Sequence, residues 1–174
     1  MKKNYKELLN HVKTFVFDVD GVLTDGTVQM IPGQQPVRTF HSKDGYILQL
    51  AIRKGYKIAI ITGGKSLAVK ERLEGLGVSD IYLGAYDKIE VYKEYEAIYN
   101  TPREEVLYMG DDIPDYEVLE YVGVATCPSD AVPEIKNICD YVSPKGGGQG
   151  CVRDVIEQTL KVQGNWMQPG DHTW

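Results

Sequence analysis

The chain has 174 residues, enough for one domain with a substantial core but short for a catalytic domain plus a second folded lid. Lys and Arg total 19 against 25 Asp and Glu, and the net charge of −6 argues against a nucleic-acid-binding protein, which usually carries a basic face. The 43% hydrophobic and 25% charged content argues against disorder, and no stretch approaches the ~20 apolar residues of a membrane helix.

The first residues of the chain and its cysteines bear on where in the cell the protein is found. Residues 1–13 lack the apolar run of a secretory signal, so we expect none. The cysteines are Cys127, Cys139 and Cys151, an odd number without a CxxC pair, which favours free thiols in a reducing environment. We therefore expect a cytoplasmic protein.

Six short apolar runs, most of them rich in β-branched or aromatic residues, predict strands. In chain order they are Thr14–Asp18, Lys57–Thr62, Ile81–Gly84, Val106–Gly110, Val124–Cys127 and Asp140–Val142. After the first of them, two short extended segments flank Pro32-Gly33-Gln34-Gln35, which predicts an inserted β-hairpin over residues 27–40.

Between the strands the apolar residues change to helical spacing. The four predicted helical stripes are Ile47/Leu50/Ala51, Val69/Leu73/Leu76, Ile89/Tyr92/Tyr95/Tyr99 and Val152/Val155/Ile156/Leu160. Thr101-Pro102-Arg103-Glu104 has the residues of a capped helix start, and Gly55 and Gly77 are predicted to end two helices. Repeated strand–helix units predict a three-layer α/β/α sandwich around a central parallel, Rossmann-like sheet.

We expect a single domain over residues 1–162, followed by a polar C-terminal tail over 163–174. The tail contains both tryptophans, Trp166 and Trp174, so it either frays or docks onto another subunit. The glycine-rich loop at 145–150 is interpreted as a flexible connection or as a hinge for this tail.

Ligands of such sheets bind beyond the carboxyl ends of the strands, and this selects the candidate site residues. The first strand ends on Asp18-Val19-Asp20-Gly21, two carboxylates followed by a glycine that permits a tight turn. The fourth ends on Gly110-Asp111-Asp112-Ile113-Pro114-Asp115. Its three carboxylates repel one another, and a hard cation such as Mg²⁺ would relieve that repulsion.

Two further pieces suit a phosphate group. Thr62-Gly63-Gly64 follows the second strand, and Asp87-Lys88 opens a helix. A hydroxyl, backbone N–H groups and an ammonium near helix starts are what a phosphate needs. All four pieces lie at strand ends on the predicted ligand side.

This ordered set resembles the haloacid dehalogenase superfamily of phosphatases, in DVDGVLTD at 18–25, Thr62, Lys88 and GDDxxD at 110–115. The resemblance implies that Asp18 is the nucleophile and forms an aspartyl phosphate. It implies that Asp20 protonates the leaving oxygen and then deprotonates the attacking water.

The same resemblance implies the remaining roles at the site. Asp18, the backbone carbonyl of Asp20 and Asp111 would hold Mg²⁺. Thr62 and Lys88 would hold the phosphoryl oxygens. Asp112 would support the metal site, and Asp115 would orient Lys88.

No large insertion follows the hairpin or separates Lys88 from Gly110, so the chain resembles the capless members of the superfamily. Over roughly residues 12–164 it is similar to the 3-deoxy-D-manno-octulosonate 8-phosphate (KDO 8-phosphate) phosphatases. The supporting stretches are FHSKDGYIL at 40–48, ITGGKSLAVKERLEGLGV at 61–78, YLGAYDK at 82–88 and GGGQGCVRDV at 146–155. This implies hydrolysis of KDO 8-phosphate, a step toward the lipopolysaccharide inner core. It also implies a homotetramer in which a neighbour's hairpin covers each site, and no nucleic-acid or membrane partner.

The choice of substrate depends on a few side chains. Lys65 and Arg72 share one helical stripe, where Arg72 could pair bidentately with a carboxylate. The expected substrate contacts are Gly21, Thr24, Gly63, Gly64, Lys65 and Arg72. The similar nine-carbon (KDN or sialic acid 9-phosphate) phosphatases tend to carry an acid and a lysine where this chain has Gly64 and Gly75, which favours the eight-carbon substrate. A nine-carbon phosphatase, and a catalytically idle Mg²⁺- and phosphate-binding assembly subunit, remain alternatives.

Overall fold

The computed structural model describes residues 4–174; residues 1–3, the start of the predicted 1–162 domain, lie outside the described part. The described chain contains a six-stranded parallel sheet in the order β3-β2-β1-β4-β5-β6. The strands are β1 (Thr14–Phe17), β2 (Lys57–Ile61), β3 (Asp80–Tyr82), β4 (Val106–Met109), β5 (Val124–Cys127) and β6 (Tyr141–Val142). All six predicted strands are confirmed, to within two residues at either end.

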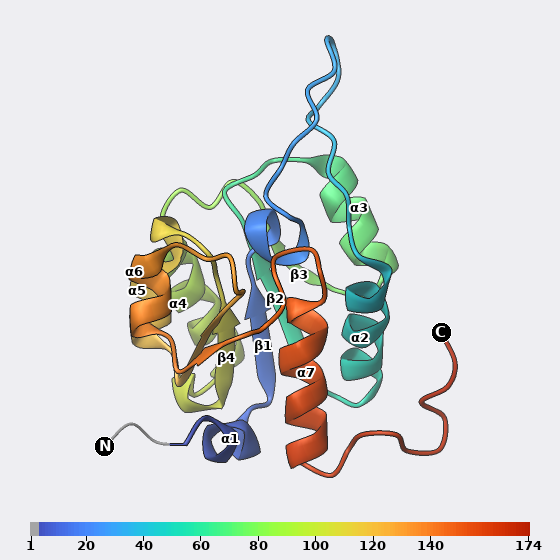
Figure 1. The fold of residues 1–174 in the computed structure, drawn as a ribbon, viewed down its shortest axis with the longest axis vertical. Helices are drawn as coiled ribbons and strands as arrows, with labels where there is room; N and C mark the ends of the chain where they lie inside the picture. Colours follow the sequence, from blue (N-terminus) through green and yellow to red (C-terminus); the bar gives the residue numbers. More distant parts are fainter. Residues whose placement is uncertain (1–3) are drawn as a thin grey trace.

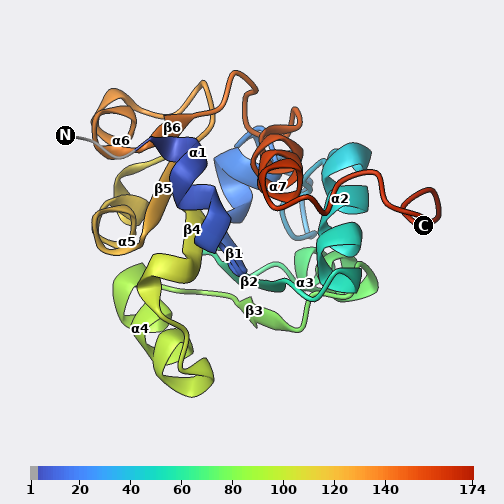
Figure 2. The same cartoon turned by 90° about the horizontal axis from the view of Figure 1, so that it is seen from below.

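The helices are α1 (Tyr5–Leu8), α2 (Ser42–Arg53), α3 (Leu67–Gly75), α4 (Lys88–Tyr99), α5 (Tyr116–Tyr121), α6 (Pro133–Ile138) and α7 (Cys151–Val162), with single turns η1 (Leu9–His11), η2 (Val19–Leu23), η3 (Arg103–Glu105) and η4 (Ile113–Asp115). α2, α3 and α7 cover one face of the sheet, and α4, α5 and α6 cover the other (Figures 1 and 2). The predicted three-layer sandwich is confirmed. Among residues 4–174, no helix has the length and apolar content to span a membrane.

The central strands are buried on both faces, which explains their continuous apolar runs. Phe15 and Phe17 of β1 pack toward α2, α3 and α7, whereas Val16 packs toward the opposite helices. In β4, Leu107 and Tyr108 divide between the faces in the same way. Burying one such large side chain stabilises the fold by about 1.5–3 kcal/mol, so both layers are held firmly to the sheet.

Two helices end at glycines as predicted, but the helix predicted to start at Thr101 is not present. Gly55 and Gly77 lie just past α2 and α3 at φ of 88° and 91°, as predicted for glycines that end helices. Thr101 does not cap a helix: its buried hydroxyl has no hydrogen-bond partner, and only the single turn η3 follows Pro102. That turn leads directly into β4, which leaves no room for a longer helix.

The strand order creates the site. The chain runs from β1 outward through β2 to β3, then crosses back to β4 on the other side of β1. A crevice forms at the carboxyl ends of strands where the direction of winding reverses. Asp18 follows β1 and Asp111 follows β4, so both lie at this crevice.

The predicted hairpin is present but is less regular than expected. Residues 27–40 form the arm that rises above the sheet at the top of Figure 1. Within it, Gln29 and Val37 form one antiparallel bridge with two N–H···O bonds of 3.0 Å. Val28 and Met30 are exposed, so no core packing extends this pairing into longer strands.

The C-terminal tail is ordered against its own chain, in contrast to the expectation of fraying. Lys54 at the end of α2 forms a 2.8 Å ion pair with Asp171, whose carbonyl accepts a hydrogen bond from Tyr46. Trp174 packs edge-on against Tyr46 at 5.5 Å between ring centroids. Trp166 packs against the Arg153 and Lys161 cations of α7. The tail therefore covers the outer surface of α2 and α7.

Candidate active site

The loop after β1 presents two carboxylates at the crevice. Asp18 is buried, and its Oδ1 accepts a 2.6 Å hydrogen bond from the N–H of Val19. Gly21 follows at φ 87°, and a Cβ there would lie 1.9 Å from Oδ2 of Asp111. Only glycine therefore fits where this loop meets the loop after β4.

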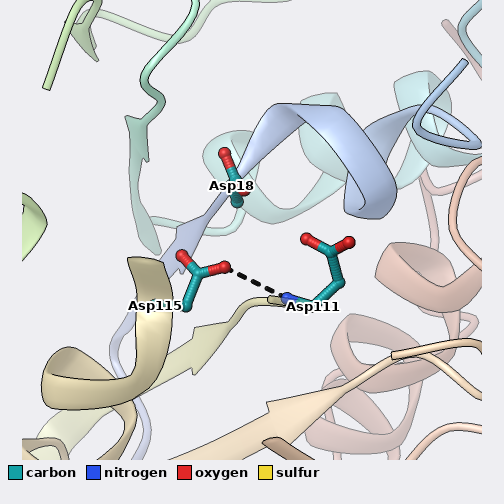
Figure 3. A group of neighbouring side chains, drawn as sticks. All are labelled: Asp18, Asp111 and Asp115. Atoms are coloured by element: carbon teal, nitrogen blue, oxygen red, sulfur yellow. Dashed lines mark hydrogen bonds between the residues drawn. The ribbon is translucent and has the colours of Figure 1, made fainter. Parts of the chain in front are cut away.

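Asp115 organises the acidic loop after β4. Its Oδ1 accepts hydrogen bonds from the Lys88 ammonium at 2.7 Å and from the Tyr108 hydroxyl at 2.6 Å. Its Oδ2 accepts from the N–H group of Asp111 at 3.1 Å (Figure 3). The same oxygen accepts from the N–H group of Asp112 at 3.4 Å. Both carboxylate oxygens are thus occupied, which makes Asp115 a support rather than a free metal ligand.

Lys88 neutralises part of the acidic cluster. It is the first residue of α4, is buried, and lies 2.8 Å from Oδ2 of Asp18. Burial disfavours its charge, but Asp115 and Asp18 outweigh that effect and raise the pKa of Lys88 above its ordinary value. The ammonium therefore remains charged at the position where the sequence predicts a phosphate contact.

The ionised forms of Asp18 and Asp111 are destabilised by their surroundings. Burial, and then repulsion from Asp115, raises the pKa of Asp18 to about 7, against the opposing effect of Lys88. Burial, and then repulsion from Asp18 and Asp115, raises the pKa of Asp111 to about 7. The carboxylates of Asp18, Asp111 and Asp115 offer ligand atoms within 4.8 Å of one another.

These residues fit a hard divalent cation. Three carboxylates against the single Lys88 ammonium leave an excess of two negative charges when all are ionised. The donors are all oxygens, which suits Mg²⁺. Because Asp115 is already saturated, the side chains that fit the metal are Asp18 and Asp111, as the resemblance implied.

A cavity of about 580 Å³ opens over these groups. Ten of the predicted site residues line it: Asp18, Asp20, Thr62, Gly63, Gly64, Lys65, Lys88, Asp111, Asp112 and Asp115. Gly26, Gly84, Ala85, Tyr86 and Pro114, which the sequence did not single out, line it as well. Tyr86 is fully exposed at the rim.

Three predicted substrate contacts lie outside this lining. Gly21 serves the close approach to Asp111 described above. Thr24 is buried, and its hydroxyl accepts from the N–H of Gly26 at 3.2 Å, so it shapes the loop. Arg72 lines a separate groove of about 510 Å³ between the hairpin and α3. Its contact with a substrate remains a prediction.

Sequence reasoning missed Arg38 on the returning side of the hairpin. Its Nε donates to Oδ1 of Asp20 at 2.6 Å and its Nη2 donates to Oδ2 at 3.0 Å. These hydrogen bonds raise the pKa of Arg38 against the effect of burial. No spacing rule marks this residue, because the contact depends on how the hairpin folds back over the loop.

The glycine-rich loop is packed rather than free. A Cβ at Gly147 would lie 2.0 Å from the carbonyl oxygen of Gly21, and one at Gly148 would lie 2.6 Å from the nitrogen of Asp25. The N–H of Gly148 donates to the carbonyl of Val22 at 2.9 Å. The flexible-connection interpretation is therefore wrong: this loop supports the loop that carries Asp18 and Asp20.

Known proteins share both the sequence and the fold. Residues 74–153 match the family model described as haloacid dehalogenase-like hydrolase. The 3-deoxy-D-manno-octulosonate 8-phosphate phosphatase of Escherichia coli K12 is 34% identical over 154 residues, covering 88% of this chain and 82% of that protein.

Solved structures of phosphatases of the same name share the fold of this chain. The phosphatase of the same name from Yersinia pestis superposes with a TM-score of 0.91 at 31% identity, over 94% of this chain and 88% of that one. The Moraxella catarrhalis enzyme, solved with a magnesium ion, a phosphate ion and a KDO molecule, gives 0.90 at 32% identity over 93% of each chain. This chain is therefore a phosphatase of the haloacid dehalogenase-like hydrolases and belongs to the family of the 3-deoxy-D-manno-octulosonate 8-phosphate phosphatases.

Proposed function

We propose that this protein is a Mg²⁺-dependent phosphomonoesterase that hydrolyses KDO 8-phosphate to KDO and phosphate, in the synthesis of the lipopolysaccharide inner core. The relatives named above carry that activity in their names. The observation that carries the proposal is the Asp18 carboxylate at the cavity, 2.8 Å from the buried Lys88 ammonium and beside Asp111.

In the first step, a carboxylate oxygen of Asp18 attacks the phosphorus and the ester oxygen leaves, giving an aspartyl phosphate. Such a transfer needs positioning and charge neutralisation more than covalent assistance. Lys88 and the Thr62 hydroxyl line the same cavity and would hold the phosphoryl oxygens. Mg²⁺, held by Asp18, the carbonyl of Asp20 and Asp111, would offset the repulsion between carboxylate and phosphate.

Asp20 would be the general acid of the first step and the general base of the second. It lines the cavity and its side chain is about one-third exposed, which supports this role. It would give a proton to the departing sugar oxygen, and then take one from the water that attacks the aspartyl phosphate. The second step releases phosphate and restores Asp18.

Assembly and location belong to the same proposal. We propose a homotetramer in which the hairpin arm of a neighbour covers the open cavity. The exposed Val28 and Met30 on the arm support this, because apolar side chains on a projecting arm favour a protein contact. Light scattering that finds a monomer at working concentration would remove this part. The buried cysteines are consistent with a cytoplasmic location, which cell fractionation would test.

The decisive experiment is a phosphate-release assay on KDO 8-phosphate and KDN 9-phosphate, with Mg²⁺ and with EDTA. We expect Mg²⁺-dependent turnover and a higher kcat/KM on the eight-carbon substrate, because Gly64 and Gly75 stand where the nine-carbon enzymes tend to carry charged residues. A preference for KDN 9-phosphate would establish the alternative substrate. If no sugar phosphate is turned over and Asp18→Asn changes nothing, the protein is an idle assembly subunit.

A further inference from the structure

Tyr108 contacts the active site from within the core. It lies on β4, is fully buried, and packs on the face of the sheet that α4, α5 and α6 cover. Its hydroxyl donates to Oδ1 of Asp115 at 2.6 Å. Its carbonyl accepts a 2.9 Å hydrogen bond from the buried Thr126 hydroxyl of β5, and β4 is paired with a strand on either side. The tyrosine is therefore held in place independently of Asp115.

The carboxylate of Asp115 is held by four donors. Lys88 and Tyr108 share its Oδ1, at 2.7 and 2.6 Å. Two backbone N–H groups of the acidic loop donate to its Oδ2. Of these four donors, the Tyr108 hydroxyl is the one that is a neutral side-chain group. It can therefore be removed without changing the charge or the backbone of the site.

The Lys88 ammonium is shared between two carboxylates. It lies 2.7 Å from Oδ1 of Asp115 and 2.8 Å from Oδ2 of Asp18. A second cation in place of the Tyr108 hydroxyl would offset the charge of Asp115 and weaken its attraction for Lys88. A neutral hydroxyl fixes the carboxylate and leaves its full negative charge to face the ammonium. A tyrosine thus suits the placement of Lys88 better than a basic residue would.

Tyr92 shows that a buried hydroxyl in this layer does not need a partner. It lies on α4, is fully buried in the same layer as Tyr108, and its hydroxyl has no hydrogen-bond partner among the described residues. The layer therefore tolerates an unpaired tyrosine hydroxyl. The bond from Tyr108 to Asp115 is not a general requirement of packing there, and Tyr92 supplies a matched control.

We propose that Tyr108 is a positioning residue: by fixing the Asp115 carboxylate, its hydroxyl keeps the Lys88 ammonium in the place from which it binds the phosphoryl group. This inference rests on the proposed phosphate contact of Lys88. Without the hydroxyl, Oδ1 of Asp115 loses one of its two donors, and the carboxylate can turn about its Cβ–Cγ bond. The ammonium then spends less time in that place, and phosphate binds less tightly.

Phosphate affinity tests this role without requiring turnover. Isothermal titration calorimetry of the Mg²⁺-loaded protein with inorganic phosphate measures the Kd directly. We expect Tyr108→Phe to raise that Kd about three- to tenfold, because a buried hydrogen bond to a charged group is lost. On KDO 8-phosphate, kcat/KM should fall by at least about threefold. The Ki of KDO, which carries no phosphate group, should stay within about twofold.

Two variants serve as controls. Tyr92→Phe removes a buried hydroxyl that has no partner, and should leave the phosphate Kd and kcat/KM within about twofold. Replacing Tyr108 with 4-aminophenylalanine keeps a donor at the same place and should return the phosphate Kd to within about twofold of wild type. A merely structural role would lower the fraction of folded protein, and so the number of binding sites in the titration, without changing Kd.

An unchanged phosphate Kd in Tyr108→Phe would overturn the proposal. Equal losses in Tyr92→Phe and Tyr108→Phe would overturn it as well, as would a parallel rise in the Ki of KDO or a 4-aminophenylalanine variant that binds phosphate no better than Tyr108→Phe. If KDO 8-phosphate is not hydrolysed by the wild-type protein, the proposed substrate fails, but the ratio of the phosphate Kd values still decides the role of Tyr108.

Discussion

Lys88 and Asp115 form a buried ion pair of 2.7 Å that joins the first residue of α4 to the loop after β4. Asp115 also accepts the Tyr108 hydroxyl, and burial raises the pKa of that tyrosine well above its ordinary value, so it remains a donor. Lys88 in turn contacts Asp18. One carboxylate that is not expected to touch substrate thus sets the position of the ammonium beside Asp18.

Replacing Asp115 should therefore impair both stability and catalysis. Asp115→Asn removes one of the two charges that face Lys88 and weakens the acceptor of the Tyr108 hydroxyl, while Lys88 keeps Asp18 as a partner. A buried donor that loses a full partner should cost about 1–3 kcal/mol. Urea unfolding measures this loss, and kcat should fall with it because Asp115 no longer fixes the position of Lys88. Asp112→Asn, on an exposed side chain, is the matched control and should stay near wild-type stability. Equal stability of the two variants would contradict the role given to Asp115.

The metal-free protein should lose stability as the pH rises. The pKa of Asp111 is about 7 in the folded protein, against 3.8 for an ordinary aspartate in an unfolded chain, so the folded state holds more protons between these values. This contribution is complete below about 3.8 and is lost as the pH rises through about 7. In EDTA, the difference in unfolding free energy between pH 5 and pH 8 should shrink in Asp111→Asn. An unchanged difference would show that Asp111 is not responsible.

Mg²⁺ should reverse that trend. A cation bound by Asp18 and Asp111 favours their ionised forms and competes with protons. The rise in Tm on adding Mg²⁺ should be larger at pH 8 than at pH 5, and at ~100 times the Kd the stabilisation should reach about 2.7 kcal/mol. Differential scanning calorimetry measures it. An equal shift in Asp111→Asn would place the metal elsewhere.

The glycine loop offers a further test. Gly147→Ala introduces a Cβ 2.0 Å from the carbonyl oxygen of Gly21, so the loop must move. We expect a loss of about 1–3 kcal/mol together with reduced kcat, because the displaced backbone belongs to the loop of Asp18 and Asp20. Gly75→Ala, in open space at the end of α3, should be neutral or stabilising. A fully active, stable Gly147→Ala would refute the support role.

The tail gives a prediction that separates stability from activity. Asp171→Ala removes the partner of Lys54 at the outer surface of α2 and should lower Tm with a cost of about 1 kcal/mol. Activity should persist below the new Tm, because the tail packs on α2 and α7 and does not line the cavity of its own chain. A loss of kcat in the folded variant would instead favour a tail that serves a neighbouring site.

The sheet and most of the cavity were predictable because they follow local rules. Apolar runs mark buried parallel strands, and the crossover at β1 brings Asp18 and Asp111 to one crevice without further information. Lys88 and Thr62 follow from the same rule, since each stands at a strand end or a helix start.

The rest depends on contacts between distant segments. Arg38 reaches Asp20 only because the hairpin folds back, and nothing in its own neighbourhood signals this. The four-glycine loop gives the composition of a flexible connection, yet two of its glycines, Gly147 and Gly148, are required by the close approach of the backbone of residues 21–25. Thr101 satisfies a capping pattern, but β4 begins too soon for a helix to form.

The packing of the glycine loop on the catalytic loop also affects the order of folding. The thiol of Cys151 donates to the carbonyl of Val22, a contact across 129 positions of sequence. Asp18 is synthesised early, but the backbone of residues 21–25 beside it can gain its contacts with the glycine loop and α7 only after those residues have been synthesised. Contacts between residues this far apart in sequence are slow to form, because the entropy of closing a long loop must be overcome first. We therefore expect chains arrested on the ribosome before the glycine loop to contain most of the sheet and no phosphatase activity, so that enzyme activity reports the completed fold.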